Sequence, residues 1–265
     1  MLMQPRNISL AFAIASTLAV SSAAVAQSES SSTLEEITVT AQRRAERLQD
    51  VPIAVSAFTS SELEVRNVTQ ALDLIQYVPN MNGNNNTGLG SANVYFLRGL
   101  GNTDSIATFD PPVGTYIDDI YIARQNSNNF GLFEVERIEV LRGPQGTLFG
   151  RNTTGGAINL LLRKPGDVMR GTAEVGFGSF GEKRVRASID LPVNDILSTQ
   201  IAGYYVKSDG YIDNLTTGDE DNGKDEAGLR AAFQLKLGSS ATWNAAVNYL
   251  YSGTLNKLGF ECGTV

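Results

Sequence analysis

Two segments decide the fold of this chain: Glu134-Val135-Glu136-Arg137-Ile138-Glu139-Val140-Leu141-Arg142-Gly143-Pro144 and, shortly after it, Gly155-Gly156-Ala157-Ile158-Asn159. The first predicts a short strand with its charges on one face, and the second predicts a return strand that starts on two glycines. A turn is expected at Gly143 and Pro144, because glycine tolerates positive φ, whereas proline fixes φ at about −65° and donates no hydrogen bond.

Short elements of both kinds precede these segments. The capping-box spacing of Thr59 and Glu62 predicts a helix that runs toward Val68. Residues Thr69–Val78 predict a second short helix, which ends before Pro79, and Asn80–Asn93 predicts a loop because Asn and Gly crowd it. Further strands are predicted at Val51–Phe58, Val94–Gly99 and Val113–Tyr121. Such a mixture over residues 45–165 predicts a small α+β domain.

The pattern changes after residue 165 to long two-residue alternation. Apolar side chains recur at Leu229, Ala231, Phe233, Leu235 and Leu237, and polar ones lie between them. Alternation over about ten residues is typical of strands in outer-membrane barrels, and the alternative is a soluble antiparallel sheet with one wet face. The phase of Leu197–Lys207 stays open.

Only about five such strands fit into residues 166–265, whereas the smallest membrane barrels need about eight. These residues therefore predict the start of a barrel, in a fragment or a truncated product. Its turn at Gly178–Gly181 resembles a periplasmic hairpin, and Asp209–Glu226 resembles a longer extracellular loop.

The N-terminus has the three parts of a secretory signal peptide. Arg6 is basic, Ile8–Val20 is apolar, and Ala24-Val25-Ala26 offers small residues for cleavage after Ala26. Residues 1–26 are therefore predicted to be removed on export.

Composition excludes several classes of function. The chain of 265 residues contains no histidine, which removes Ser-His-Asp and Cys-His catalysis and any His-containing metal site. Its formal net charge of −7 without a basic cluster argues against nucleic acid as a partner. Cys262 is the only cysteine, so no disulfide closes within the chain. We expect no catalytic residues, no metal and no cofactor.

Four motifs occur in an order that resembles the plug domain of TonB-dependent outer-membrane receptors. They are Phe96-Leu97-Arg98-Gly99, Pro112-Val113-Gly114-Thr115-Tyr116-Ile117-Asp118, Leu141-Arg142-Gly143-Pro144-Gln145-Gly146 and Gly155-Gly156-Ala157-Ile158-Asn159. The expected fold class is an α+β plug domain followed by the first antiparallel strands of an incomplete transmembrane β-barrel.

The resemblance also assigns an arm at residues 27–44. Glu36, Ile37, Thr38, Val39, Thr40 and Ala41 resemble the TonB box. This β-branched run has no obvious strand beside it in the sequence, which suits addition to the sheet edge of a partner. The resemblance implies that the partner is the periplasmic protein TonB.

Two arginines are implied to hold the plug in place. Arg98 and Arg142 each end a strand before glycine, and in the family such residues pair with barrel glutamates. The alternative is ordinary surface ion pairs. Asp118 and Asp119, placed in a strand, point to opposite faces and are interpreted as structural.

The implied function is active uptake of a scarce ligand, such as a ferric siderophore, a vitamin or a glycan, across a Gram-negative outer membrane. The ligand-binding residues are unknown, with the loops Asn80–Asn93 and Gly101–Pro111 as candidates. Two alternatives remain: a plug-type periplasmic binding module without transport activity, and an exported enzyme.

Overall fold

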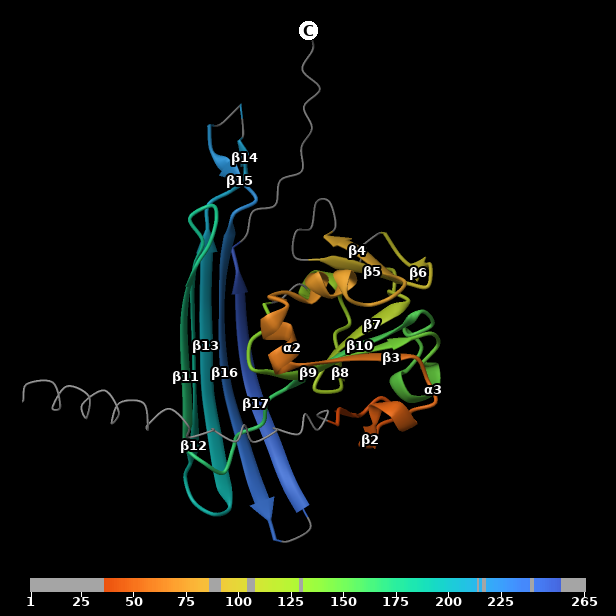
Figure 1. Cartoon of the computed structure of the whole chain (residues 1–265), viewed down its shortest axis with the longest axis vertical. Helices are drawn as coiled ribbons and strands as arrows, with labels where there is room; N and C mark the ends of the chain where they lie inside the picture. Colours follow the sequence, from red (N-terminus) through yellow and green to blue (C-terminus); the bar gives the residue numbers. More distant parts are fainter. Residues whose placement is uncertain are drawn as a thin grey trace, which may run out of the picture. The chain divides into compact units, whose positions relative to one another are not determined.

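The computed structural model describes residues 36–85, 92–103, 108–128, 131–213, 215, 218–238 and 241–253 (Figure 1). The predicted signal peptide, its cleavage site after Ala26, and Cys262 lie outside these residues. The elements before residue 165 are β1 (Thr38–Val39), β2 (Glu46–Arg47), η1 (Leu48–Asp50), β3 (Val55–Thr59), α2 (Ser60–Val65), η2 (Ala71–Gln76), β4 (Met81–Asn85), β5 (Asn93–Leu97), β6 (Leu100–Gly101), β7 (Val113–Ile117), β8 (Ile120–Tyr121), η3 (Gln125–Ser127), β9 (Val135–Arg142), α3 (Gly146–Phe149) and β10 (Gly156–Leu162).

A five-stranded mixed sheet organises this part of the chain, in the order β3-β9-β10-β7-β8. The predicted strand and its return strand are confirmed, since β9 and β10 pair antiparallel with Arg142 opposite Gly156. Strand β10 then pairs parallel with β7. Between β9 and β10 the chain makes the short helix α3 as well as the expected turn at Gly143.

The first face of this sheet carries the larger apolar core. Both predicted short helices contribute to it, through Leu63 of α2 and Leu74 of η2, and η2 is a 3-10 helix. The predicted capping box is present, because the Thr59 backbone N–H donates to the Glu62 carboxylate and the Glu62 N–H donates to the Thr59 hydroxyl. No helix in the described part of the chain has the length and apolarity needed to span a bilayer.

The prediction that Asn80–Asn93 is a loop is wrong for its first part. Residues Met81–Asn85 form strand β4, which pairs antiparallel with β5 from Met81–Leu97 to Asn85–Asn93. Asn and Gly have low intrinsic strand preference, but the backbone ladder with β5 and the burial of Met81 override it.

The prediction of one strand over Val113–Tyr121 is also wrong. The segment is a hairpin of β7 and β8, in which Tyr116 lies opposite Tyr121. Asp118 and Asp119 form its two-residue turn, with φ of 46° and 67°. Aspartate tolerates these left-handed values better than most residues, so the turn that breaks the strand consists of the two acids themselves.

A second, separate sheet follows residue 165, in the order β11-β12-β13-β16-β17 with every pair antiparallel. Its strands are long, and a small hairpin, β14-β15, lies between β13 and β16 (Figure 1). The bounds are β11 (Arg170–Phe177), β12 (Lys183–Pro192), β13 (Leu197–Ser208), β14 (Ile212–Asp213), β15 (Glu220–Asp221), β16 (Lys224–Leu237) and β17 (Ala241–Ser252).

The two faces of this second sheet reverse the usual pattern of a soluble protein. On β16, Leu229 and Phe233 are exposed by 61% and 41%, whereas Arg230 between them is only 4% exposed. The sequence leaves open which side chains of Leu197–Lys207 face outward. In the structure Tyr205 faces outward and Tyr204 is buried, so this strand has the same two faces as β16. An apolar outer face and a polar inner face are what strands facing lipid require, and they argue against the soluble alternative.

One expectation about the turns is wrong. The turn at Gly178–Gly181 and the hairpin β14-β15 lie at the same end of the sheet, because two antiparallel strands, β12 and β13, separate them. The Asp209 N–H donates to the Phe180 carbonyl at 2.8 Å, and the rings of Phe180 and Tyr211 lie 6.0 Å apart. The connections from β12 to β13 and from β16 to β17 lie at the opposite end of the sheet.

Gly156 offers a test of the first sheet. Its φ is 152°, and a Cβ added there would lie 2.3 Å from the Leu141 carbonyl oxygen and 2.6 Å from Leu97 Cδ1. We expect Gly156→Ala to lower the free energy of unfolding by at least about 2 kcal/mol, because the central pair β9-β10 would have to separate.

The matched control is Gly146→Ala, since a Cβ there would meet nothing within 4 Å. This change in helix α3 should be neutral or slightly stabilising. Denaturant midpoints of the two variants give the comparison, and equal midpoints would contradict the close approach described at Gly156.

Candidate functional site

The arm that carries the candidate TonB box is folded onto the second face of the first sheet. Thr38 and Val39 form strand β1, which pairs antiparallel with Arg47 and Glu46 of β2. The side chains of Val39 and Ala41 are fully buried in a small apolar cluster on that face. The expectation that this run lacks a neighbouring strand is therefore wrong, because its partner follows only a few residues later.

The apolar cluster beneath the arm draws on the sheet and on helix α3. Leu141 of β9, Ala157 of β10 and Tyr116 of β7 come from the sheet, and Phe149 comes from α3. The Tyr116 hydroxyl donates to the Phe149 carbonyl oxygen at 2.5 Å, and the two rings meet edge to face. The arm thus completes a core that the sheet alone leaves open.

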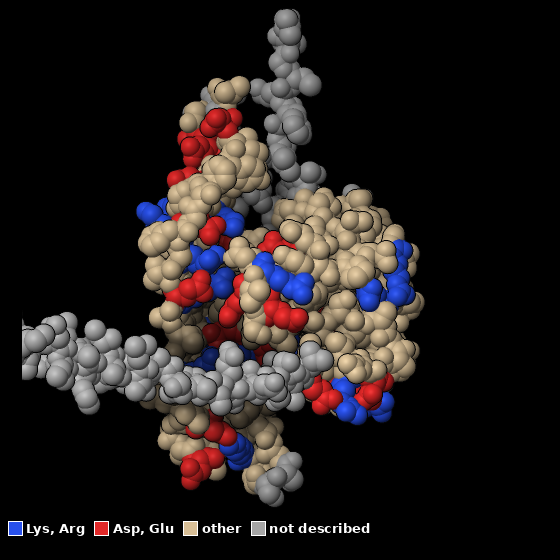
Figure 2. All heavy atoms as spheres, in the orientation of Figure 1, with Lys and Arg blue, Asp and Glu red and all other residues tan. Residues whose placement is uncertain are grey.

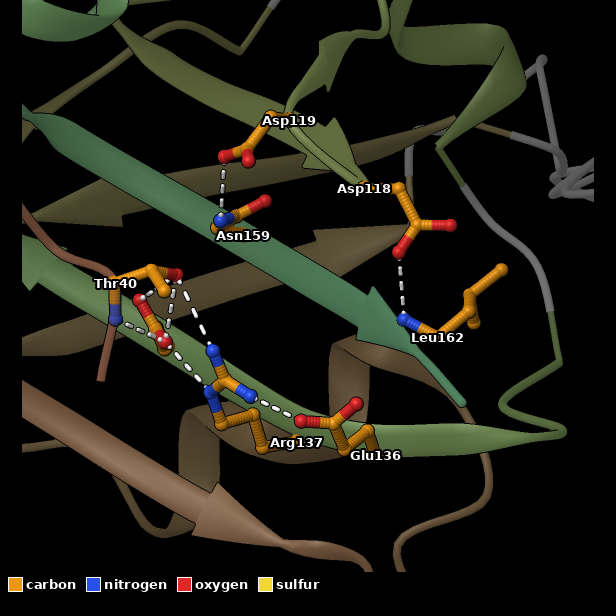
Figure 3. A network of polar contacts seen from close by, with 8 residues as sticks. Thr40, Asp118, Asp119, Glu136, Arg137, Asn159 and Leu162 are labelled. Atoms are coloured by element: carbon orange, nitrogen blue, oxygen red, sulfur yellow. Dashed lines mark hydrogen bonds and ion pairs between the residues drawn. The ribbon is translucent and has the colours of Figure 1, made fainter. Parts of the chain in front are cut away.

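A buried carboxylate joins the arm to the sheet (Figure 3). Glu139 of β9 is fully buried, and its Oε1 accepts a hydrogen bond from the Thr40 backbone N–H at 2.8 Å and another from the Thr40 hydroxyl at 3.1 Å. Arg137 Nε donates to the same oxygen at 2.8 Å, and Arg137 also pairs with Glu136. The negative charge of Glu139 is therefore matched by one guanidinium and two donors from the box.

Exposed ion pairs surround the box. Arg47 pairs with Glu36 at 3.1 Å and with Asp50 at 2.8 Å, and Arg44 pairs with Glu46 at 2.5 Å. Figure 2 shows acidic and basic side chains interspersed at this edge of the domain. Solvent screens such pairs, so they add little stability compared with the buried contact at Glu139.

Of the two predicted anchoring arginines, Arg98 lies beside Gly143, the residue that follows Arg142. A Cβ on Gly143 would lie 3.3 Å from Nη1 of Arg98, so the guanidinium of Arg98 reaches the residue that follows Arg142. Arg142 Nε is buried without a hydrogen-bond partner, and neither arginine forms an ion pair with any described residue. Arg98 is exposed to solvent, whereas the buried Nε of Arg142 has no hydrogen-bond partner among the described residues and would gain from an acceptor.

Sequence reasoning missed the cluster that joins the two sheets. Arg163, just after β10, contacts Glu134 Oε2 at 2.6 Å and Asp190 Oδ2 of β12 at 2.5 Å. Gln200 of β13 is fully buried and donates to Asp190 at 2.9 Å and to Glu134 at 3.1 Å. The available signal was the alternation itself, which places Asp190 and Gln200 on the polar inner face.

The hairpin turn of Asp118 and Asp119 makes structural contacts, as interpreted from the sequence. Asp118 Oδ1 accepts from the Leu162 N–H at 2.8 Å, and Asp119 Oδ1 accepts from the Asn159 amide at 3.1 Å (Figure 3). Asp118 also faces Arg230 of β16 at 3.7 Å. Burial raises the pKa of the Asp118 carboxyl, an effect that the Leu162 N–H and the Arg230 charge oppose.

The two candidate ligand loops are described only in part, since residues 86–91 and 104–107 lie outside the described chain. Asp110, in the second loop, lines a cavity of about 430 Å³ together with Tyr116, Tyr121 and Phe149. It also pairs with Arg151 at 2.9 Å. Within the described residues, no group of three or more carboxylate, thiol or imidazole side chains is arranged to hold a metal ion.

Comparison with known proteins identifies the class to which this fold belongs. Residues 47–157 match the family model described as TonB-dependent Receptor Plug Domain. The crystal structure of the ferric yersiniabactin uptake receptor FyuA from Yersinia pestis is similar, with a TM-score of 0.68 and 26% identity over 74% of this chain and 31% of that chain. The pyoverdine outer membrane receptor FpvA from Pseudomonas aeruginosa shares the fold, with a TM-score of 0.67 at 17% identity.

Relatives by sequence agree. A pesticin receptor of Yersinia enterocolitica is 30% identical over 217 residues, which are 80% of this chain and 30% of the relative. The vitamin B12 transporter BtuB of Vibrio vulnificus is 27% identical over 179 residues, which are 68% of this chain and 29% of the relative. The chain thus spans about a third of the length of these relatives, which are receptors and transporters rather than enzymes.

The fold is that of a receptor plug followed by antiparallel strands of the receptor barrel, and the predicted fold class is confirmed. The chain belongs to the TonB-dependent outer-membrane receptors.

The cluster between the sheets generates a prediction. Asp190→Asn should lower the free energy of unfolding by about 2–3 kcal/mol, because it leaves the half-buried Arg163 without one of its two carboxylates. The control is Asp167→Asn, since Asp167 is exposed and solvent screens its pair with Lys236, so its loss should cost much less stability. Denaturant unfolding of the full chain in detergent measures both, and a larger loss in the control would refute the ranking.

Proposed function

We propose that this chain is the N-terminal portion of a TonB-dependent receptor that actively takes up a scarce ligand across the outer membrane of a Gram-negative bacterium. The observation that carries the proposal is a folded plug joined to a sheet whose outer face is apolar and whose inner face is polar. A water-exposed binding module has no use for such an outer face. Residues 1–26, 27–44, 45–165 and 166–265 then correspond to signal peptide, arm, plug and first barrel strands.

In this proposal, Glu36–Ala41 is the segment that TonB pairs with by strand addition. Main-chain hydrogen bonds supply the affinity in such pairing, and alternating side chains supply the specificity. The run suits this role because Ile37, Val39 and Ala41 share one face of the extended chain. Its neighbour in the fold, β2, is only two residues long and is therefore a replaceable partner.

The ligand belongs, in this proposal, to the class of ferric siderophores, vitamins or glycans. Similar receptors are named for pesticin, for vitamin B12 and for ferric yersiniabactin, which supports this class without selecting a member. The candidate contact regions are residues 80–93, of which Met81–Asn85 form strand β4, and residues 101–111. Transport requires no covalent chemistry from the chain.

Arg98 and Arg142 are assigned to plug retention. Neither side chain forms an ion pair with a described residue, and a planar guanidinium binds carboxylates through two parallel bonds. Glutamates of further barrel strands are the proposed partners.

Ile37→Pro tests the role of the box. Proline removes a backbone N–H and disfavours strand pairing, so this change should abolish binding to the periplasmic domain of TonB while ligand capture is unchanged. Ile37→Val is the matched control, because it keeps both the N–H and the β-branched side chain. Calorimetry with the TonB domain and a ligand-binding assay on cells separate the two effects. Normal TonB binding by the proline variant would rule the segment out.

A further inference from the structure

The arm is held in a way that affects its availability to a partner. Three kinds of contact act on the six residues Glu36–Ala41: the ladder with β2, the burial of Val39 and Ala41, and the hydrogen bonds from Thr40 to Glu139. The backbone groups of this segment that bond to β2 and to Glu139 are not available to a second strand until these contacts break, so docking of the arm limits its pairing with a partner.

The contact at Glu139 differs in kind from the other two. Strand β9 is central in its sheet, flanked by β3 and β10, so the Glu139 backbone is fixed whether or not the arm is present. Its carboxylate is fully buried and takes two of its three donors from Thr40. Departure of the arm would therefore leave a buried anion with only Arg137 as its partner, which opposes departure until water enters.

We propose that Glu139, oriented by Arg137, is a latch that keeps the TonB box docked on the plug and thereby sets how often TonB can reach it. This inference rests on the proposed function for its partner, but the docking equilibrium of the arm is a property of this chain alone. Glu139 is a positioning residue, since it acts through Thr40 and does not itself contact TonB.

The docking equilibrium is measurable by thiol accessibility. A Cys262→Ser background removes the one native thiol, and Ala41→Cys then places a small thiol at a fully buried position of the arm. Its alkylation rate by a maleimide reports how often the arm opens. Ala71→Cys, in the same background, is a second reporter in the core on the other face of the sheet, where Ala71 is 3% exposed.

Three substitutions form a graded series in the full chain in detergent. Glu139→Ala should raise the alkylation rate at position 41 by about tenfold or more, because the hydrogen bonds from Thr40 to a charged acceptor are lost. Glu139→Gln keeps an acceptor oxygen without the charge and should have an intermediate effect. Glu136→Gln is the control, since Glu136 also pairs with Arg137 but, within the described part of the chain, makes no hydrogen bond with Thr40.

The alkylation rates at positions 41 and 71 decide whether Glu139 acts as a latch. Faster alkylation at position 41 with an unchanged rate at position 71 supports the latch. Equal rates in all variants overturn it, and so does a parallel rise at position 71, which would make Glu139 a general stabiliser of the plug. Binding of the periplasmic TonB domain, measured with the native Ala41, should tighten by the same factor in Glu139→Ala.

The last measurement also distinguishes this inference from the proposed function. If the arm opens in Glu139→Ala but no variant binds the TonB domain, the latch stands and the partner assignment fails. If all variants bind the TonB domain with the same affinity and are alkylated at position 41 at the same rate, the partner assignment stands and the latch fails.

Discussion

The structure depends on strand β9, whose two faces pack against two different apolar cores. Its alternate residues Ile138 and Val140 face the larger apolar core, whereas Glu139 and Leu141 face the smaller one beneath the arm. Because side chains alternate strictly along a strand, a shift of one residue would bury charge in the larger core and point apolar groups at the arm. The pairing of β9 with β3 and β10 fixes that register from both sides.

The second sheet obeys the same alternation with a different solvent. Here the polar side chains point inward, where Asp190 and Gln200 meet Arg163 and Glu134, and the apolar side chains point outward. In water this arrangement would destabilise the folded state, since the apolar face stays exposed while charged groups lose their hydration. In an outer membrane, lipid would cover the apolar outer face, and the ion pairs and hydrogen bonds of the inner face with Arg163 and Glu134 offset its lost hydration.

Much of this could be predicted from the sequence because the deciding signals are local. Some patterns predict their structure within a few residues: the capping box at Thr59, the alternation in β16 and the glycines before β10. The missed features depend on residues far away in the chain. Strand β4 forms from an Asn- and Gly-rich segment because β5 offers it a ladder, and the arm docks because Glu139, 99 residues later, supplies an acceptor.

The candidate site divides in the same way. The box and the two arginines could be singled out by their motifs, whereas the fact that Arg98 approaches Gly143 required the structure. The turn of Asp118 and Asp119 was assigned a structural role for a wrong reason, since the two acids do not lie within a strand but end it. No local pattern distinguishes a strand interrupted by two aspartates at positive φ from one that continues.

The long separation between Thr40 and Glu139 also constrains the order of folding. A chain made from its N-terminus has already released the arm before β9 exists, and β9 itself needs β10 and β3 around it. Contacts between distant residues form late, because closing a long loop costs entropy before any contact repays it. The contact of Thr40 with Glu139 is therefore expected to form after the sheet around β9, so that the arm docks late in folding.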